Sequence, residues 1–351
     1  METTNDSAIR EAELVFAAQT GDTAAFERLV ETYRGPLHAY CYRMLGSVHD
    51  ADDALQDTLL GAWRGMSGFE TRSSLRTWLF RIATHACLHL ADRRPRRIMS
   101  TEYGPPRTDV YDLGDMVNEP IFLEPYPDRR AGDDADPESR YEQRENVELA
   151  FVAAVQHLAA NQRAVLILRD VLQFSAAEAA LALETSVAAV NSMLQRARKS
   201  VGGRIAAGTQ RAELQSLGEQ GQRDLVAAFV AAWERADIST MVGLLADDAR
   251  FSMPPLPAWF ASRDAIIRFM VERASQTPWR VTPMRANGQL AFALYQGDAS
   301  DGPFCMSAIN VVTLQDGLIV EMIGFLDPNV HRRFGLPAEL SAMSFGRAAS
   351  L

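Results

Sequence analysis

Cysteine is scarce in this chain of 351 residues, which contains only Cys41, Cys87 and Cys305. An odd number of widely separated cysteines excludes a disulfide-stapled secreted scaffold. Cys41 and Cys87 fall within apolar helical patterns, so we expect small buried thiols in a reducing cytoplasm. No group of cysteine, histidine and acidic residues has the spacing of a metal site, and we expect neither a metal nor a cofactor.

Long hydrophobic runs are also missing. No stretch approaches the roughly 20 apolar residues that a helix needs to cross a bilayer. The first residues, Met1–Asp6, are polar and acidic, which is not the pattern of a secretory signal peptide. The sequence therefore predicts a cytoplasmic protein without a membrane partner.

Positive charge is in deficit, because 35 lysines and arginines face 45 acidic residues and leave a net charge of -10. This argues against a protein that coats nucleic acid indiscriminately. The two signs are unevenly distributed, however. Ser47–Asp57 contains four aspartates and no lysine or arginine, whereas Arg72–Arg97 contains seven arginines and one acid. Local charge directs docking more than the total does, so one acidic and one basic surface are predicted.

Residues 10–97 have the pattern of a helical domain, with apolar residues three and four positions apart. Asp50 favours the start of one helix, because its carboxylate suits the positive helix N-terminus. Asp50, Asp53 and Asp57 fall on one side of that helix, with Gln56 beside them. These four residues form either a solvated acidic face or a protein-docking face.

The following helix begins at Ser73 or Ser74 and carries arginine, threonine, aromatic and histidine side chains outside its apolar stripe. Such a mixture can pair with phosphates and stack on splayed bases. His85 and His89 are four residues apart, but no third ligand for a metal is evident. The pattern therefore favours a DNA-facing helix.

Residues 98–145 form a long connector with several proline- and glycine-rich turns. A segment of this length without regular structure is uncommon inside one compact domain. The connector includes the apolar stretch 121–126, which we expect to be a docking strip for another part of the protein.

Residues 146–204 predict a second helical domain that ends in a helix-turn-helix. Ser175 and Glu178 have the spacing of a capping box, and Ser186 can cap the last helix. That helix has small residues toward its start and basic residues toward its end, which suit base edges and phosphates respectively. An unrelated helical hairpin is the alternative.

Residues 222–335 predict helices followed by strands, which is an α+β layout. The expected helices cover 224–235, 238–245 and 265–274. The expected strands cover 250–253, 279–286, 290–295, 305–314 and 318–325. Asp316–Gly317 predicts a tight hairpin between the last two strands, within an antiparallel sheet.

The two helical domains together resemble an extracytoplasmic-function (group IV) sigma factor of the sigma-70 family. Asp50–Asp57 matches region 2.2 of that family, and Leu75–Ala83 matches region 2.3 into 2.4. Gln162–Leu166, Ser175–Glu178 and Ser186–Arg198 match region 4. The matches follow the order of the family.

The third region looks like a SnoaL-like domain of the NTF2-like cone fold. The resemblance therefore implies a multidomain protein with two all-α sigma domains followed by an α+β NTF2-like domain. Its expected parts are a region 2 helical bundle (10–97), a linker (98–145), a region 4 helix-turn-helix (146–204) and the NTF2-like domain (222–335).

The resemblance implies two partners: core RNA polymerase, through its β′ clamp helices and β flap, and promoter DNA. It places four residues against polymerase, namely Asp50, Asp53, Gln56 and Asp57. It places nine residues at the promoter −10 element: Arg76, Thr77, Trp78, Arg81, Thr84, His85, His89, Arg93 and Arg94. It places nine more at the −35 element: Ser186, Ala188, Ala189, Asn191, Ser192, Gln195, Arg196, Arg198 and Lys199.

This chain departs from the family pattern in three places. His85 and His89 stand where many members have asparagine and aspartate, which bears on the −10 sequence that the chain prefers. Asn161 replaces a frequent proline, and Glu184 stands where glycine is common in the turn of the helix-turn-helix.

In a recognised group of these sigma factors, a fused SnoaL-like domain substitutes for a separate anti-sigma protein. The resemblance therefore implies that the C-terminal domain is a partner in cis that modulates activity, with tethering supplying a high effective concentration. Two alternatives stay open: an NTF2-like enzyme or ligand sensor fused to a DNA-binding module, and a helix-turn-helix regulator that does not engage polymerase.

Five side chains of the third region are expected to line its cavity, unless they simply fill the core: Trp259, Tyr295, Met306, Phe325 and Asp327. Asp264, Asp298 and Asp327 are the carboxylates nearest to the acid/base positions of enzymes with this fold. No pair of carboxylates is fixed by spacing, so we expect no catalysis.

Overall fold

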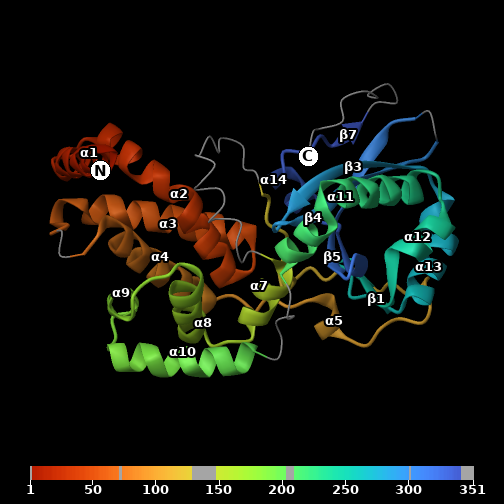
Figure 1. Cartoon of the computed structure of the whole chain (residues 1–351), viewed down its shortest axis with the longest axis horizontal. Coiled ribbons are helices and arrows are strands. Elements are labelled where there is room, and N and C mark those ends of the chain that lie inside the picture. The colour runs from red at the N-terminus through yellow and green to blue at the C-terminus, as the bar shows by residue number, and fades with distance from the viewer. Residues whose placement is uncertain (1, 71–72, 129–147, 203–208, 300–301, 341–351) are drawn as a thin grey trace. The chain divides into compact units, whose positions relative to one another are not determined.

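The computed structural model describes residues 2–70, 73–128, 148–202, 209–299 and 302–340 (Figure 1). The chain divides into two compact units. The helical unit contains Met1–Arg96 and Asp133–Ile205, and the sheet unit contains Arg97–Gly132 and Ala206–Leu351. The described part of the connector therefore belongs to the same unit as the C-terminal region.

The helical unit has two groups of helices within its described residues. The first group is α1 (Glu2–Gln19), α2 (Thr23–Leu45), α3 (Val48–Gly65) and α4 (Leu75–Ala91), with a 3-10 turn at Met66–Gly68. The second group is α7 (Leu149–Gln156), α8 (Ala160–Leu166), a π turn at Ile167–Val171, α9 (Ala176–Ala182) and α10 (Val187–Val201).

The helix starts follow the capping chemistry of the sequence. The capping box predicted at Ser175 and Glu178 is confirmed, and the Ser186 hydroxyl accepts a hydrogen bond from a backbone N–H of α10. Asp50 is not the first residue of its helix. The cap is Ser47, whose hydroxyl accepts from the Asp50 N–H at 3.1 Å, so that Asp50 lies in the first turn.

Helices α2, α3 and α4 pack together and bury the apolar stripes that the residue spacing predicted. The rings of Tyr40 and Phe80 meet edge to face between α2 and α4, with their centroids 5.4 Å apart. The Tyr40 hydroxyl lies 2.8 Å from the Thr84 hydroxyl in the same buried layer. Cys41 and Cys87 are both buried free thiols, as predicted.

The sheet unit combines helices and a seven-stranded sheet. Its helices are α5 (Ser100–Tyr103), α11 (Gln210–Glu234), α12 (Ile238–Leu244), α13 (Arg263–Glu272) and α14 (Pro328–Arg333), with a 3-10 turn at Ala274–Gln276. Its strands are β1 (Leu245–Ser252), β2 (Trp259–Ala261), β3 (Trp279–Ala286), β4 (Gln289–Gly297), β5 (Phe304–Gln315), β6 (Leu318–Phe325) and β7 (Glu339–Leu340).

The strand order is β2-β1-β6-β5-β4-β3, with β7 paired to β5. The hairpin predicted at Asp316–Gly317 is confirmed, since both residues have positive φ and Gln315 pairs with Leu318. The expectation of an antiparallel sheet is wrong at one place, because β1 and β6 pair in parallel. Strands β3, β4, β5 and β6 follow one another in the sequence, and each pairs antiparallel with the next. Strand β1 instead pairs with β6, from which it is separated in the sequence by β2, α13, β3, β4 and β5.

The sequence also misjudged the entry into this unit. The first helix was expected over 224–235, but α11 begins at Gln210, after Thr209 caps its first turn. Gly218, at φ +65°, joins two helical pieces across a kink, which a residue with a side chain would resist. Strands β2 and β7 were not predicted, because three and two residues are too short to show a period.

One face of the sheet packs against α11 and α13, and α12 contacts both of these helices. Figure 1 shows α11 lying along β3 and β4. Aromatic rings fill this interior: Phe229 stacks on Phe292 with 3.8 Å between centroids, and Phe251, Phe260 and Phe269 pack together. Among the described residues, no helix is long and apolar enough to cross a membrane.

Candidate polymerase-binding and DNA-binding surfaces

The acidic face of α3 is partly internal. The Asp50 carboxylate is 2% exposed and lies 3.6 Å from the Arg94 guanidinium, so it is held inside the helical unit. Asp53 is half-buried, whereas Gln56 and Asp57 are exposed. The structure therefore leaves the later residues of this set at the surface and puts the first one against a residue expected to face DNA.

The nine residues expected at the −10 element also divide into two groups. Thr77, Trp78 and Thr84 are buried in the helical unit. Thr84 bridges the Tyr40 hydroxyl and the backbone oxygen of Phe80, which is a packing role. The spacing of residues along α4 could not show that another helix, such as α2 at Thr84, covers these side chains.

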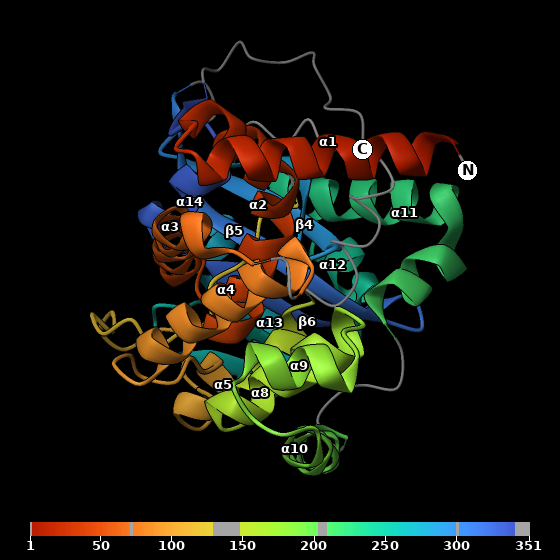
Figure 2. The ribbon, with the colours of Figure 1, turned by 90° about the vertical axis from the view of Figure 1, so that its left-hand side faces the viewer.

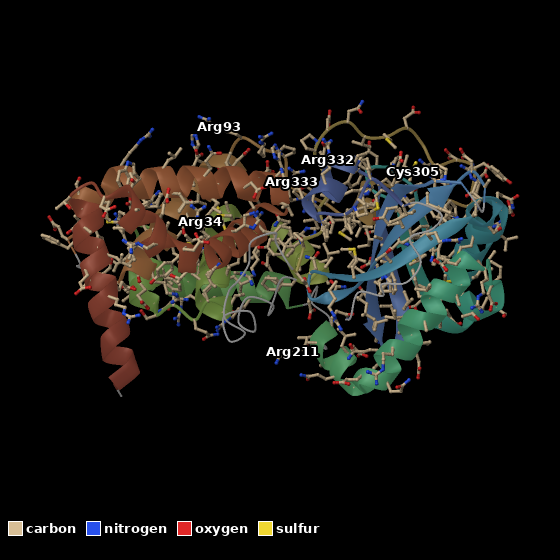
Figure 3. The ribbon with its side chains drawn as sticks, turned by 90° about the horizontal axis from the view of Figure 1, so that it is seen from above. Arg34, Arg93, Arg211, Cys305, Arg332 and Arg333 are labelled. Carbon is tan, nitrogen blue, oxygen red and sulfur yellow. The ribbon has the colours of Figure 1, made fainter. Side chains whose placement is uncertain are left out.

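The exposed members of that set form a stripe. Arg81, His85 and His89 are exposed and four residues apart, which places them on one face of α4. Arg93 and Arg94 follow at the end of the helix and are also exposed, and Figure 3 labels Arg93 at the surface. This basic stripe can pair with a phosphate backbone.

The start of α4 is covered by the segment between α8 and α9. The Arg76 guanidinium donates to the backbone oxygen of Leu172 at 2.7 Å and lies 4.1 Å above the ring of Phe174. Phe174 itself is fully buried and packs edge to face on Phe80. Figure 2 shows α9 beside α4.

Two further polar contacts join α4 to the helix-turn-helix. The Thr77 hydroxyl donates to Glu178 at 3.2 Å, and His85 lies 3.5 Å from the Glu184 carboxylate. The hydrogen bonds from Ser175 lower the pKa of Glu178. Glu184 adopts φ +50°, the left-handed turn conformation that explains why glycine suits this position.

A third contact fixes α8 to the end of α2. Arg163 is buried and donates to the backbone oxygens of Val155, Gln156 and Leu158, and to that of Met44 in the last turn of α2. The last carbonyls of a helix have no intrahelical partner, so a guanidinium is well suited to them. Burial lowers the pKa of Arg163 to about 10, which still leaves it charged. Sequence reasoning did not single out this residue.

The recognition helix α10 presents its predicted residues to the surface. All of the nine are exposed except Ala189, which is half-buried. Arg198 is engaged within the unit: its Nε and Nη2 atoms donate to the two carboxylate oxygens of Asp170 at 2.9 Å and 2.6 Å. This bidentate pair raises the pKa of Arg198 and holds α10 against the π turn.

The five side chains expected to line one cavity of the sheet unit do not lie together. Tyr295 and Met306 are in a cluster on the opposite side of the sheet from the aromatic interior. Trp259 donates from Nε1 to the backbone oxygen of Gly104 at 2.7 Å, and so contacts the connector. Phe325 and Asp327 do line one cavity, whose other wall is the connector itself.

The connector is hydrogen-bonded along the sheet unit. The Arg107 N–H donates to the Trp259 oxygen at 2.8 Å, and the Val117 N–H donates to the Pro255 oxygen at 3.0 Å. Near its described end, Tyr126 exchanges two hydrogen bonds with Asn287, at 2.7 Å and 2.8 Å. Phe122, Leu123 and Tyr126 are buried.

These features define a class: a transcription factor with a helix-turn-helix, a second basic helix beside an acidic face, and a fused NTF2-like domain. Family models agree over three ranges: Sigma-70 region 2 matches residues 29–97, Sigma-70 region 4 matches 148–201, and the SnoaL-like domain matches 226–322.

Individual proteins are similar to this chain over most or part of its length. The ECF RNA polymerase sigma factor SigG of Mycobacterium tuberculosis is 41% identical over 93% of this chain and 89% of its own length. SigM of the same species is 31% identical over 54% of this chain and 81% of its own length. The crystal structure of M. tuberculosis SigJ shares the fold, with a TM-score of 0.54 and 21% identity over 87% of this chain and 97% of that chain.

The chain belongs to the extracytoplasmic-function (ECF) sigma factors of RNA polymerase. It is an alternative sigma factor for transcription initiation, with a SnoaL-like domain in its C-terminal part.

Proposed function

We propose that this sigma factor binds the β′ clamp helices of core RNA polymerase through the exposed part of the α3 acidic face. Asp53, Gln56 and Asp57 are the residues that a partner can reach directly. Asp50 supports the surface from inside by holding Arg94. The helix-turn-helix domain meets the β flap in the same complex.

Promoter DNA is read by two separate surfaces. The stripe of Arg81, His85 and His89 on α4, together with Arg93 just after its end, meets the −10 element. Helix α10 enters the major groove at the −35 element. Arg76 and Thr77 reach DNA only after the Phe174 segment has moved away, because both contact that segment or α9 here. Promoter binding is therefore coupled to separation of α4 from the helix-turn-helix.

The C-terminal domain regulates this separation in cis through the connector. The observation that carries the proposal is the chain of hydrogen bonds from the connector to Trp259, Pro255 and Asn287. Because the connector is the covalent link between regions 2 and 4, a domain that holds it limits how far the two regions can move apart.

A matched pair of tryptophans tests the proposal. Trp259→Phe removes the indole donor to the connector at Gly104, whereas Trp279→Phe removes an equivalent donor to Ala274 inside the sheet unit. One lost hydrogen bond of about 1 kcal/mol corresponds to a change of roughly fivefold. We expect Trp259→Phe to change promoter-specific transcription with core polymerase about fivefold and Trp279→Phe to leave it unchanged. Equal transcription from both variants and the unaltered chain would contradict the regulatory role.

No catalytic role is proposed for the SnoaL-like domain. Phe229 and Phe292 stack within the hydrophobic core of the domain. Asp264 and Asp298 are exposed, and the Asp327 carboxylate accepts from the Asn329 N–H as a helix cap. These placements support a regulatory module rather than an enzyme.

A further inference from the structure

One arginine of the recognition helix α10 is already held by a carboxylate. The Nε and Nη2 atoms of Arg198 donate to the two carboxylate oxygens of Asp170 at 2.9 Å and 2.6 Å. Asp170 lies before the helix-turn-helix, in the π turn Ile167–Val171 that follows α8. Its side chain is 30% exposed and that of Arg198 is 60% exposed, so the pair stands at the surface beside α10. Sequence spacing gave no sign of Asp170, which is 28 positions from Arg198.

The position of Arg198 on α10 explains why it meets this turn. It lies four residues after Leu194 and three residues before Val201, both of which are buried. Residues three and four apart share one face of a helix, so Arg198 borders the buried stripe that packs toward α8 (Figure 1). Arg196 is exposed and lies on nearly the opposite side of the helix, because each residue turns the helix by about 100°.

The pair with Asp170 leaves part of the Arg198 guanidinium for a second partner. A guanidinium has five N–H donors in one plane, and Asp170 takes one from Nε and one from Nη2. The other donors point away from the carboxylate, and within the described part of the chain Arg198 has no further polar partner. Phosphate oxygens accept from a guanidinium edge as carboxylates do. Arg198 can therefore be held by Asp170 and contact DNA at the same time.

We propose that Asp170 is a positioning residue for DNA binding, which holds Arg198 so that the free edge of its guanidinium meets one backbone phosphate at the −35 element. This inference rests on the proposed entry of α10 into the major groove. An arginine that is mobile before binding loses conformational freedom at the phosphate, which weakens binding roughly two- to tenfold. Asp170 removes that loss, because it orders the side chain before DNA arrives.

An opposing effect of Asp170 is its repulsion of the same phosphate. Across the width of the guanidinium the two anions are about one Debye length apart, about 8 Å at physiological salt. Water and salt screen charges at this separation, so the repulsion weakens binding by less than about twofold. The ordering of Arg198 is therefore the larger effect, and Asp170 strengthens DNA binding although it carries the charge of the DNA.

A double-mutant cycle in the full chain, assembled with core RNA polymerase, tests this role. The probe is a duplex with the −35 sequence that the holoenzyme selects from a random pool, and its Kd is measured over a range of salt. We expect Asp170→Ala to weaken binding at least threefold with an unchanged salt slope, because the phosphate contact remains. Arg198→Gln should weaken binding further and lower the slope by about 0.9, the value of one phosphate contact. Exposed ion pairs contribute little to folding, so both variants should fold.

The second half of the cycle separates positioning from a structural role. In the Arg198→Gln chain no guanidinium is left to hold, so Asp170→Ala should tighten binding by up to about twofold through the lost repulsion. Arg196→Gln is the matched control, because Arg196 lies on the other side of α10. In that chain Asp170→Ala should still weaken binding at least threefold.

Two results of the cycle would overturn the proposal. Equal weakening by Asp170→Ala with and without Arg198 would show that Asp170 acts on the fold alone. Unchanged or tighter binding of Asp170→Ala in the otherwise unaltered chain would show that Asp170 does not help Arg198 to meet DNA, and a steeper salt slope would show that it withholds Arg198.

Nuclear magnetic resonance tests the pair without DNA. In the free chain the Nε–H group of Arg198 should have a higher order parameter than that of Arg196, and Asp170→Ala should abolish the difference. Equal mobility of the two groups in the unaltered chain would overturn the proposal. A random pool without an enriched sequence would contradict the −35 role and this inference together, whereas an enriched sequence with an additive cycle would contradict this inference alone.

Discussion

Single residues in this protein carry out tasks that their neighbours in sequence do not suggest. Asp50 belongs by spacing to an exposed acidic face, but it is buried and contacts Arg94. Arg163 lies in the region 4 match Gln162–Leu166, and it joins α8 to the last turn of α2. In both cases the side chain is fixed by a partner far away in the chain. Substitutions at these positions should therefore act on packing before they act on DNA binding.

Arg163→Met keeps much of the side-chain volume and removes all of its donors. Several backbone oxygens of α2 and α7 then lose a charged partner, so we expect the free energy of unfolding to fall by about 3 kcal/mol. Chemical denaturation followed by circular dichroism measures the change. Arg28→Met, at an exposed arginine of α2, is the control and should cost less than about 0.5 kcal/mol.

We predict that the stability of the folded chain depends on pH through His331. It is 5% exposed and lies 2.7 Å from the Phe325 oxygen, and burial lowers its pKa below the usual value. The unfolded chain therefore takes up a proton at a higher pH than the folded chain, and stability is lost as pH falls below about 6.5. The loss levels off below the lowered folded pKa.

The measurement is the melting temperature of the full chain between pH 7.5 and 5, compared with that of His331→Gln. The variant has no titrating ring, so its melting temperature should fall less over this interval. Parallel curves for the two proteins would show that His331 does not contribute.

At the scale of the secondary-structure elements, the two halves of α4 have different surroundings. Its second half carries the exposed stripe of Arg81, His85 and His89, whereas its first half is covered by Phe174 and α9. The contact combines a buried aromatic pair with a guanidinium over a ring. Loosening it should expose the first half of α4.

Phe174→Leu tests this coupling, because leucine stays apolar but offers no ring to Arg76. The lost cation–π and ring-pair energy is about 1–2 kcal/mol. We expect faster hydrogen exchange over residues 75–81 and tighter binding of single-stranded −10 DNA. Phe26→Leu, at an aromatic pair between α2 and α3, is the control, and it should not change DNA binding. Similar DNA binding by both variants would argue against a covered −10 surface.

For the whole molecule, the division into two units does not follow the order of the chain. The connector begins after the last helix of region 2, but its described part packs in the sheet unit. Removal of the SnoaL-like domain therefore removes the cover of Phe122, Leu123 and Tyr126. Each of these side chains gains about 1.5–3 kcal/mol from burial.

A chain that ends at Gly202 should accordingly aggregate more readily than the full chain, for a reason unrelated to promoter binding. Replacing the three exposed side chains by serine in the shortened chain should restore a monomeric elution profile in size-exclusion chromatography. Aggregation that persists after this replacement would show that another surface is responsible. The serine variant is also the appropriate shortened protein for transcription assays.

The elements whose sequence signals lie in adjacent residues were predicted correctly. The caps at Ser175 and Ser186, the hairpin at Asp316–Gly317 and strands β3 and β6 follow from adjacent residues, and the structure has them as predicted. Boundaries failed where a long-range contact decides. Strand β7 and the parallel pairing of β1 with β6 exist because distant strands lie beside them.

The sequence by itself determined the order of the domains, the family, and which helices carry acidic and basic residues, because spacing and charge are properties of the chain. Only the tertiary structure decided which of those residues are exposed. Asp50 and Thr84 are buried by helices that pack from elsewhere in the unit, and Trp259 meets a connector residue 155 positions away. Whether a side chain is exposed depends on which distant segments pack over it. The burial of apolar surface decides which faces of the helices and strands meet, and the spacing along one helix does not.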